Sequence, residues 1–141
     1  MTPNRETTMT KPRPRYLEAR TQGGVLVLTI AQPQIEGEEI AQALRDELLD
    51  AVAGSAGQKV VVDFRHVRYV SSVAFGPLLA LRRKLNEAGG RLLLCGLNST
   101  VGDVFYTTRM VDPDGAITTM FEMEPDAAAA VARLNRLPTD P

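Results

Sequence analysis

The feature that most constrains the fold of this chain is an alternation of short apolar segments with longer amphipathic ones. Val25–Ala31, Lys59–Phe64 and Arg91–Leu97 are short and rich in aliphatic residues, which is typical of buried strands. The segments between and after these strands carry apolar residues at helical spacing. Helices that connect successive strands favour a mainly parallel sheet with right-handed connections. The sequence therefore predicts an α/β sandwich.

The predicted elements follow the order β-β-α-β-α-β-α-β-α. A hairpin is expected from Tyr16–Arg20 and Val25–Ala31, because Gln22-Gly23-Gly24 lies between them. The other predicted strands are Lys59–Phe64, Arg91–Leu97 and Ala116–Glu122, the last preceded by a turn at Pro113–Gly115. The predicted helices are Glu36–Gly54, Val73–Glu87, Asn98–Met110 and Glu124–Leu137.

The length of 141 residues is that of one domain. Residues 1–13 are polar and rich in Thr, Pro and basic residues, so a flexible N-terminal tail is predicted there. The folded domain is expected over residues 14–137, and the prolines near the end predict a short C-terminal tail at 138–141. Met1 and Met9 are both candidate translational starts.

Charge and hydropathy exclude several classes of function. A net charge of −1 does not supply the excess of cations that nonspecific nucleic-acid binding requires. No apolar run approaches the roughly 18 residues that a membrane-spanning helix needs, so direct membrane insertion is not expected. The N-terminus has no apolar segment of the signal-peptide type, and the single cysteine, Cys95, has no partner for an internal disulfide. We therefore expect a cytoplasmic protein.

The sequence gives no support for catalysis. Ser71 or Ser72 at a strand-to-helix turn could serve as a nucleophile, with His66 as its base, but no G-x-S-x-G motif surrounds them. His66, the only histidine, is predicted on an exposed turn, and Cys95 lies in an apolar strand that should keep its thiol protonated. One Cys and one His do not make a metal site, and the phosphate-binding glycine motifs are missing. We predict no catalytic residue, metal or cofactor.

Ser71 and Ser72 are first predicted to be capping residues. Proline is tolerated only in the first turn of a helix, so Pro77 places the helix start near Val73 or later. Both serines then lie at or before the N-terminal cap. Ser72 as the cap would contribute roughly 1 kcal/mol relative to alanine.

The segment "KVVVDFRHVRYVSSVAFGPLLALRRKLNEAGGRLLLCGL", Lys59–Leu97, resembles the core of the STAS domain family, named for sulfate transporters and anti-sigma-factor antagonists. Family members have a buried strand ending in Asp-Leu, an Asp-Ser-Ser-Gly-Leu-Gly segment, a helix rich in leucine and arginine, and a strand after Gly-Gly. The resemblance extends over roughly residues 15–137, with the other elements in the family's order. It implies a STAS-type sandwich with about five strands and about four helices.

The resemblance also concerns a phosphorylation site. In the family, one serine at the start of this helix is phosphorylated by a partner kinase that is also the anti-sigma factor. When Phe75-Gly76 is aligned with the family's Leu-Gly, Ser71 takes the place of Asp, Val73 that of the phosphorylated serine, and Ala74 that of glycine. A shift by one residue makes Ser72 the acceptor instead. Ser72 and Ser71 therefore remain candidate phosphorylation sites.

The function that the resemblance implies is a non-catalytic, protein-binding module in bacterial transcription regulation, acting as an anti-sigma factor antagonist. The implied partner is an anti-sigma factor with serine kinase activity. We expect the partner-binding surface at Arg65, Arg68, Ser71, Ser72, Val73 and Ala74. The alternatives are a scaffold or homo-oligomer resembling stressosome components, an accessory subunit of a lipid-transport ATPase complex, and an enzyme or small-ligand binder that uses Ser72 and His66.

Overall fold

The computed structural model describes residues 16–54, 59–107 and 121–136. Its centre is a five-stranded sheet with the order β2-β3-β5-β7-β8. The strands are β2 (Leu17–Gln22), β3 (Val25–Ile30), β5 (Lys59–Asp63), β7 (Arg91–Cys95) and β8 (Glu122–Glu124). β2 runs antiparallel to β3, and all other neighbours in the sheet are parallel. The predicted α/β architecture with a mainly parallel sheet is confirmed.

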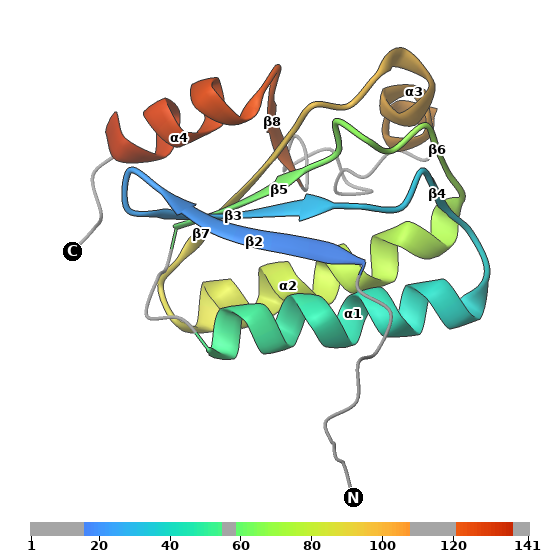
Figure 1. Cartoon of the computed structure of the whole chain (residues 1–141), viewed down its shortest axis with the longest axis horizontal. Helices are drawn as coiled ribbons and strands as arrows, with labels where there is room; N and C mark the ends of the chain where they lie inside the picture. The colour runs from blue at the N-terminus through green and yellow to red at the C-terminus, as the bar shows by residue number, and fades with distance from the viewer. Residues whose placement is uncertain (1–15, 55–58, 108–120, 137–141) are drawn as a thin grey trace, which may run out of the picture.

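Helices cover both faces of the sheet. α1 (Glu38–Ala53) and α2 (Phe75–Glu87) lie side by side on one face, and α4 (Ala127–Arg136) lies on the other (Figure 1). α3 (Ser99–Thr107) lies at the end of the sheet to which the parallel strands run. None of the helices in the described residues is long and apolar enough to cross a bilayer.

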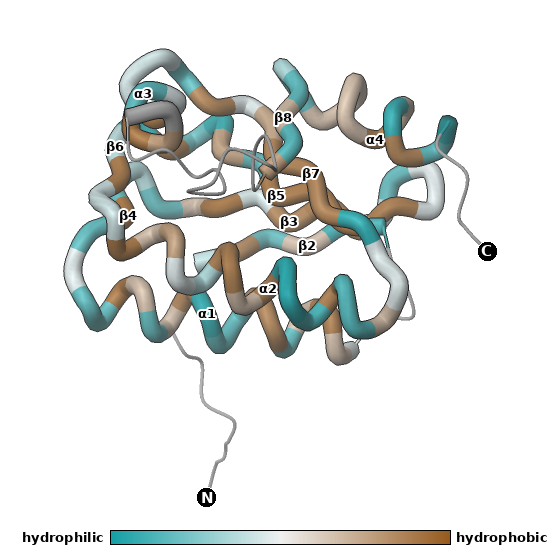
Figure 2. Tube along the Cα trace, turned by 180° about the vertical axis from the view of Figure 1, so that it is seen from behind, coloured by the Kyte–Doolittle hydropathy of each residue, from teal (hydrophilic) through white to brown (hydrophobic). Residues whose placement is uncertain are grey.

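The core is divided into two parts because side chains alternate along each strand. In β3, Leu26, Leu28 and Ile30 pack with the apolar sides of α1 and α2, whereas Val25 and Val27 pack under α4. Figure 2 shows that apolar and polar residues alternate along α1 and α2, whereas the central strands are mostly apolar. All six residues of β3 are buried, which explains why all of them except Thr29 are apolar.

The predicted hairpin is confirmed, with a tight turn. β2 and β3 are joined by Gly23 and Gly24, whose φ angles are +59° and +80°. Glycine adopts these angles without the steric cost that other residues meet. The predicted helix Glu36–Gly54 is confirmed as α1, which begins two residues later, after Gly37 at φ +96°.

A second, two-stranded sheet was not predicted. β4 (Gln34–Ile35) and β6 (Tyr69–Val70) pair in parallel, with Gln34 opposite Tyr69 and Ile35 opposite Val70. Each strand has only two residues, so neither produces an alternating pattern that sequence periodicity can detect. β4 and β6 lie with α3 at the right-hand end of the molecule in Figure 1.

The last strand differs from its prediction. β8 is a short strand, Glu122–Glu124, and overlaps the predicted Ala116–Glu122 only at Glu122. β8 does not show an apolar pattern in the sequence because two of its three residues are glutamates. Glu122 forms an ion pair with Arg91 at 2.8 Å, and Glu124 forms one with Arg133 at 2.9 Å. Several predictions concern parts of the chain outside the described residues. These parts are the two predicted tails, Met9, the turn at residues 113–115, most of the predicted last strand, and the last residues of the helices predicted to end at 110 and 137.

α4 begins at Ala127, three residues after the predicted start at Glu124. Asp126 sets this boundary because its Oδ1 accepts the Ala129 N–H at 2.8 Å and its carbonyl accepts the Ala130 N–H at 3.0 Å. Aspartate is a favoured N-terminal cap because it satisfies N–H groups that have no partner within the helix.

Candidate functional site

The segment Arg68–Ser71, which leads into α2, is fixed by backbone hydrogen bonds. The N–H groups of Arg68 and Tyr69 donate to the Pro33 carbonyl at 2.7 and 3.2 Å, and the Ser71 N–H donates to the Ile35 carbonyl at 2.9 Å. These bonds extend the β4–β6 pairing to both sides. The segment is therefore an ordered edge of the fold, with Arg68 and Tyr69 exposed and Val70 buried.

The same segment is also held from the side of α3. The Asn98 Nδ2 donates to the Val67 carbonyl at 3.2 Å, and the Asn98 Oδ1 accepts the Val101 N–H at 2.7 Å, which caps α3. The Phe75 ring packs edge to face on Phe105, with centroids 4.9 Å apart. Such aromatic pairs favour a defined geometry, so the start of α2 is anchored in the core.

The two serines lie at the start of a 3-10 turn, Ser72–Ala74, that leads directly into α2. Ser71 is half-buried and extended, and its carbonyl accepts the Ala74 N–H at 3.1 Å. Ser72 is exposed, Val73 is half-buried, and Ala74 is fully buried. Ala74 therefore lies beneath the surface on which it was expected.

The predicted capping role of the serines is wrong. Neither the 3-10 turn, whose N-terminal cap is Ser71, nor α2, whose cap is Ala74, has a side-chain hydrogen bond at its cap. The 3-10 turn supplies the entry into α2 in place of a hydroxyl cap. Pro77 lies in the first turn of α2, as predicted. The Ser72 hydroxyl is thus exposed without a structural role in starting the helix.

The turn after β5 is organised around a buried carboxylate. Asp63 is 1% exposed, and its Oδ1 accepts the Arg65 N–H at 3.0 Å, while its Oδ2 lies 3.6 Å from the Arg65 Nε. Gly96, at φ +74°, passes so close that a Cβ on it would lie 2.7 Å from the Asp63 Oδ1. Only glycine fits this position without a shift of its neighbours. His66 is exposed on this turn, as predicted.

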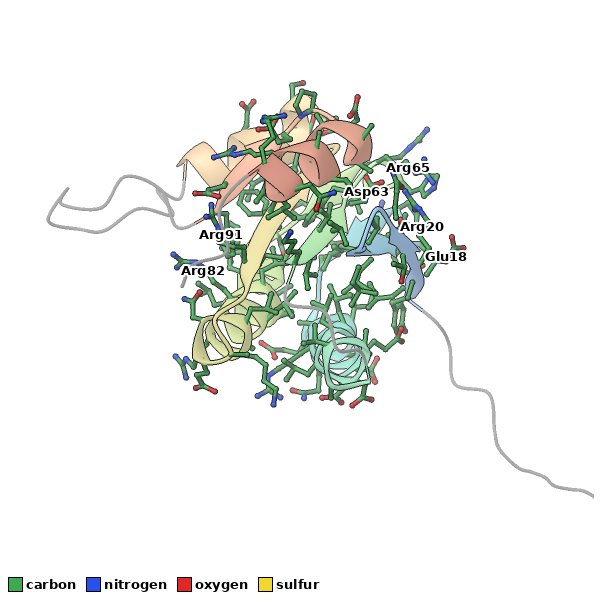
Figure 3. The ribbon with its side chains drawn as sticks, turned by 90° about the vertical axis from the view of Figure 1, so that its left-hand side faces the viewer. Glu18, Arg20, Asp63, Arg65, Arg82 and Arg91 are labelled. Carbon is green, nitrogen blue, oxygen red and sulfur yellow. The ribbon has the colours of Figure 1, made fainter. Side chains whose placement is uncertain are left out.

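The contacts of Arg65 are with a different part of the molecule from those of the serine segment. It lines an open depression of about 300 Å³, shared with Arg20, Gln22, Asp63, Gly96 and the start of α4 at Pro125–Ala128. Figure 3 shows Arg65 close to Arg20 at the edge of the sheet formed by β2. Arg68, by contrast, shares the Pro33–Ile35 backbone with the serine segment. The residues expected on one surface therefore divide into two neighbourhoods.

No hydrogen bond joins His66 to either serine among the residues that the structure describes. The same residues contain no group of three or more His, Cys, Asp or Glu side chains with the arrangement of a metal site. Two features escaped the sequence reasoning. Asp63 could have been noticed as an acid at the end of a β-branched run, and Tyr69, 41% exposed, as a large side chain within the serine segment.

The Cys95 thiol remains protonated, as predicted. Burial raises the pKa of Cys95 to about 12, and the negative charge of Asp63 and a hydrogen bond to its carboxylate act in the same direction. Cys95 lies under α4 in the core cluster with Val27, Val61 and Leu93. A neutral thiol in this place is a small apolar side chain and a poor nucleophile.

This raised pKa predicts a loss of stability in alkali. Between pH 9 and about pH 12 the thiol ionises in the unfolded chain but stays protonated in the folded chain, so the free energy of unfolding should fall as the pH rises through this window. Cys95→Ala should lose less stability between about pH 7.5 and pH 10.5 than the unmodified protein. Urea unfolding at both pH values measures this difference, and an equal loss in the two proteins would contradict the ionisation of Cys95 as its cause.

The family comparison places residues 16–126 within the model of the STAS domain. A comparison with curated protein sequences finds no match. Among solved structures, an anti-sigma factor antagonist from Mycobacterium paratuberculosis has 21% sequence identity and a TM-score of 0.68, covering 84% of this chain and 92% of that chain.

Two further structures share the fold. SpoIIAA in its unphosphorylated form is 15% identical, with a TM-score of 0.60, covering 86% of this chain and 99% of that chain. A chain from the stressosome, described as a signal integration and transduction hub, is 19% identical, with a TM-score of 0.61 and coverage of 84% and 96%. At these identities the likeness establishes a shared, SpoIIAA-like fold.

Proposed function

The chain belongs to the STAS domain family, whose model matches residues 16–126, and on this premise we propose that it is a non-catalytic binding module for an anti-sigma factor of the serine kinase type. It acts in the bacterial cytoplasm as an anti-sigma factor antagonist. Its contact surface is the exposed part of Arg68, Tyr69, Ser71, Ser72 and Val73, called the β6–α2 surface below.

The observation that carries this proposal is an exposed surface on a fixed backbone. Tyr69 is 41% exposed although the backbone on both sides of it is hydrogen-bonded to Pro33 and Ile35. A large aromatic side chain held on an ordered strand loses little conformational entropy when a partner covers it. Tyrosine is also among the residues that contribute most binding energy in protein interfaces.

The charges around this surface suit an acidic partner. Arg68 is exposed on the surface itself, and His66 is exposed on the turn that precedes it. Complementary charges accelerate encounter between two proteins and disfavour partners of the wrong sign. A cluster of Asp or Glu on the anti-sigma factor would meet this basic side.

Phosphorylation does not regulate the unmodified chain in this proposal. In the ungapped alignment with the family, the acceptor position is Val73, which has no hydroxyl. Val73 is half-buried in the 3-10 turn, so it contributes apolar contact area to the surface. The chain is then a constitutive binder whose complex depends on the concentrations of the two proteins.

The proposal is tested by isothermal titration of the protein with the anti-sigma factor kinases encoded in the same genome, with a STAS protein from another pathway as the competitor. Saturable binding of one kinase is expected, and it should weaken as the salt concentration rises because charges contribute to the encounter. A scaffold that does not bind such kinases would show no heat with any of them, which would refute the proposal.

Val73→Ser should turn the constitutive binder into a phosphorylated switch. The 3-10 turn leads directly into α2. The N–H groups at the start of the turn and the dipole of α2 favour a phosphate at position 73. Peptide mass spectrometry after incubation with the kinase and ATP should show one phosphate at position 73 and weaker kinase binding. Ser72→Ala in the same background is the control. If the phosphate disappears in that control, Ser72 is the acceptor and the alignment is shifted by one residue.

A further inference from the structure

Among the described residues, β2 is an edge strand of the sheet with no further strand beside it. The Ala31 N–H donates to the Tyr16 carbonyl at 2.8 Å, and the register pairs Leu17 with Ile30. Because the hydrogen-bonding direction alternates along an antiparallel strand, Glu18 and Arg20 bond to β3, whereas Ala19 and Thr21 direct their N–H and carbonyl groups away from the sheet. Ala19 and Thr21 are both exposed. β2 thus offers backbone groups to another strand.

The side chains of β2 make this edge complementary to itself. Glu18 and Arg20 are both exposed and lie on the face of the sheet that carries α4, and Figure 3 shows them at the same edge of the molecule. If two copies of β2 pair antiparallel with Ala19 opposite Ala19, each Glu18 lies opposite the Arg20 of the other copy. Opposite charges in directly facing positions stabilise paired strands.

Other pairings of the same two edges are disfavoured. Only residues that direct their backbone groups outward can face each other in hydrogen-bonded positions, so the register shifts in steps of two residues. One such shift places Arg20 opposite Arg20, and the opposite shift places Glu18 opposite Glu18. Like charges in facing positions are destabilising. The sequence Glu18-Ala19-Arg20 therefore selects one register.

We propose that a second copy of this chain pairs with β2, forming a homodimer with a continuous sheet and a two-fold axis at Ala19. The two Ala19 backbones exchange hydrogen bonds, and each Thr21 N–H donates to the Leu17 carbonyl of the other copy. The two-fold axis makes each of these hydrogen bonds occur twice, as in any isologous interface. The β6–α2 surface takes no part in the pairing.

Existing contacts of the edge are compatible with this pairing. The Leu17 N–H donates to the Glu47 Oε1 at 3.1 Å and keeps that partner, so Leu17 takes part in the ladder only through its carbonyl. Arg20 donates to the Gln22 Oε1 through Nε and Nη2 and to the Thr29 Oγ1 through Nη1. A guanidinium has five N–H groups, so N–H groups remain for a carboxylate of the second copy.

Charge reversal tests the proposal by sedimentation equilibrium of the full chain, whose mass is 15.3 kDa. The unmodified protein should reach twice this mass as its concentration rises. Glu18→Arg and Arg20→Glu should each raise the dimer dissociation constant about tenfold or more, because each creates facing like charges. The double variant Glu18→Arg/Arg20→Glu should restore dimerisation, since the opposite charges face each other again.

A cysteine crosslink tests the register independently of affinity. Facing residues in a hydrogen-bonded pair have Cα atoms about 5.5 Å apart, within the range that a disulfide requires. Ala19→Cys should therefore form a disulfide-linked dimer on oxidation, whereas Thr21→Cys, whose two copies would lie about 14 Å apart, should not. Cys95 is buried and serves as no competitor. A single 15.3-kDa species at millimolar concentration, a dimer unaffected by charge reversal, or equal crosslinking of both cysteines would overturn the proposal.

Discussion

Gly96→Ala is expected to lower the free energy of unfolding by about 3 kcal/mol. Part of this loss comes from the φ of +74°, which costs a residue with a Cβ about 1–2 kcal/mol. The rest comes from the new methyl group, which would lie 2.7 Å from the Asp63 Oδ1 and 3.0 Å from the Arg65 nitrogen. The hydrogen bond from the Arg65 backbone N–H to the Asp63 Oδ1 must then lengthen. A buried carboxylate that loses its hydrogen-bond donor lowers the stability of the fold.

Gly89→Ala is the matched control for this change. Gly89 has nearly the same φ, +78°, but nothing lies within 4 Å of a Cβ placed on it. It should therefore lose only the conformational part, about 1–2 kcal/mol. Urea unfolding of the two variants measures the difference. Equal losses would mean that the turn at Asp63 accommodates the methyl group by a small shift, so that its stability does not require glycine at position 96.

Tyr69→Ala is expected to weaken binding of the anti-sigma factor about 30-fold, the effect of losing an aromatic residue near the centre of an interface. The side chain is 41% exposed, so its removal should leave the fold intact. Its backbone N–H remains bonded to Pro33, since that bond does not involve the ring. Titration calorimetry measures the affinity, and thermal unfolding confirms that the variant is folded.

Met123→Ala is the control for the loss of exposed apolar area. Met123 is 37% exposed, comparable to Tyr69, but lies on β8 at one edge of the five-stranded sheet, whereas β6 belongs to the separate two-stranded sheet. Its removal should change the affinity less than about twofold, as most residues outside an interface do. If Met123→Ala weakens binding and Tyr69→Ala does not, the partner binds near β8 and the β6–α2 surface is the wrong site.

Most of the fold could be predicted because its signals are local. β3, β5 and β7 are continuous apolar runs, and α1 and α2 have apolar residues at helical spacing, so burial of these residues dictates the elements. β4 and β6 could not be predicted, since each exists through a partner about 35 residues away in sequence. β8 has alternating glutamates held by Arg91 and Arg133, which resembles a solvated loop in sequence.

The candidate site could be placed in sequence but not resolved in space. The resemblance to the STAS family led to Ser71–Ala74, and the structure shows that Ser72 is exposed whereas Ala74 is buried. The expected cap was wrong because a 3-10 turn replaces a hydroxyl cap, and propensity does not distinguish these two ways of starting a helix. Arg65 was grouped with the serines by sequence proximity, but Asp63 draws it toward Arg20 and α4.

The most direct test of the central claim is native mass spectrometry of the protein mixed with its genome-encoded anti-sigma factor kinase and ATP. One spectrum reports both the complex and any phosphate. We predict a complex in which this chain keeps its unmodified mass, and a complex of Tyr69→Ala that forms only at higher protein concentrations. Two separate proteins at every concentration, with Tyr69→Ala indistinguishable from the unmodified chain, would contradict it.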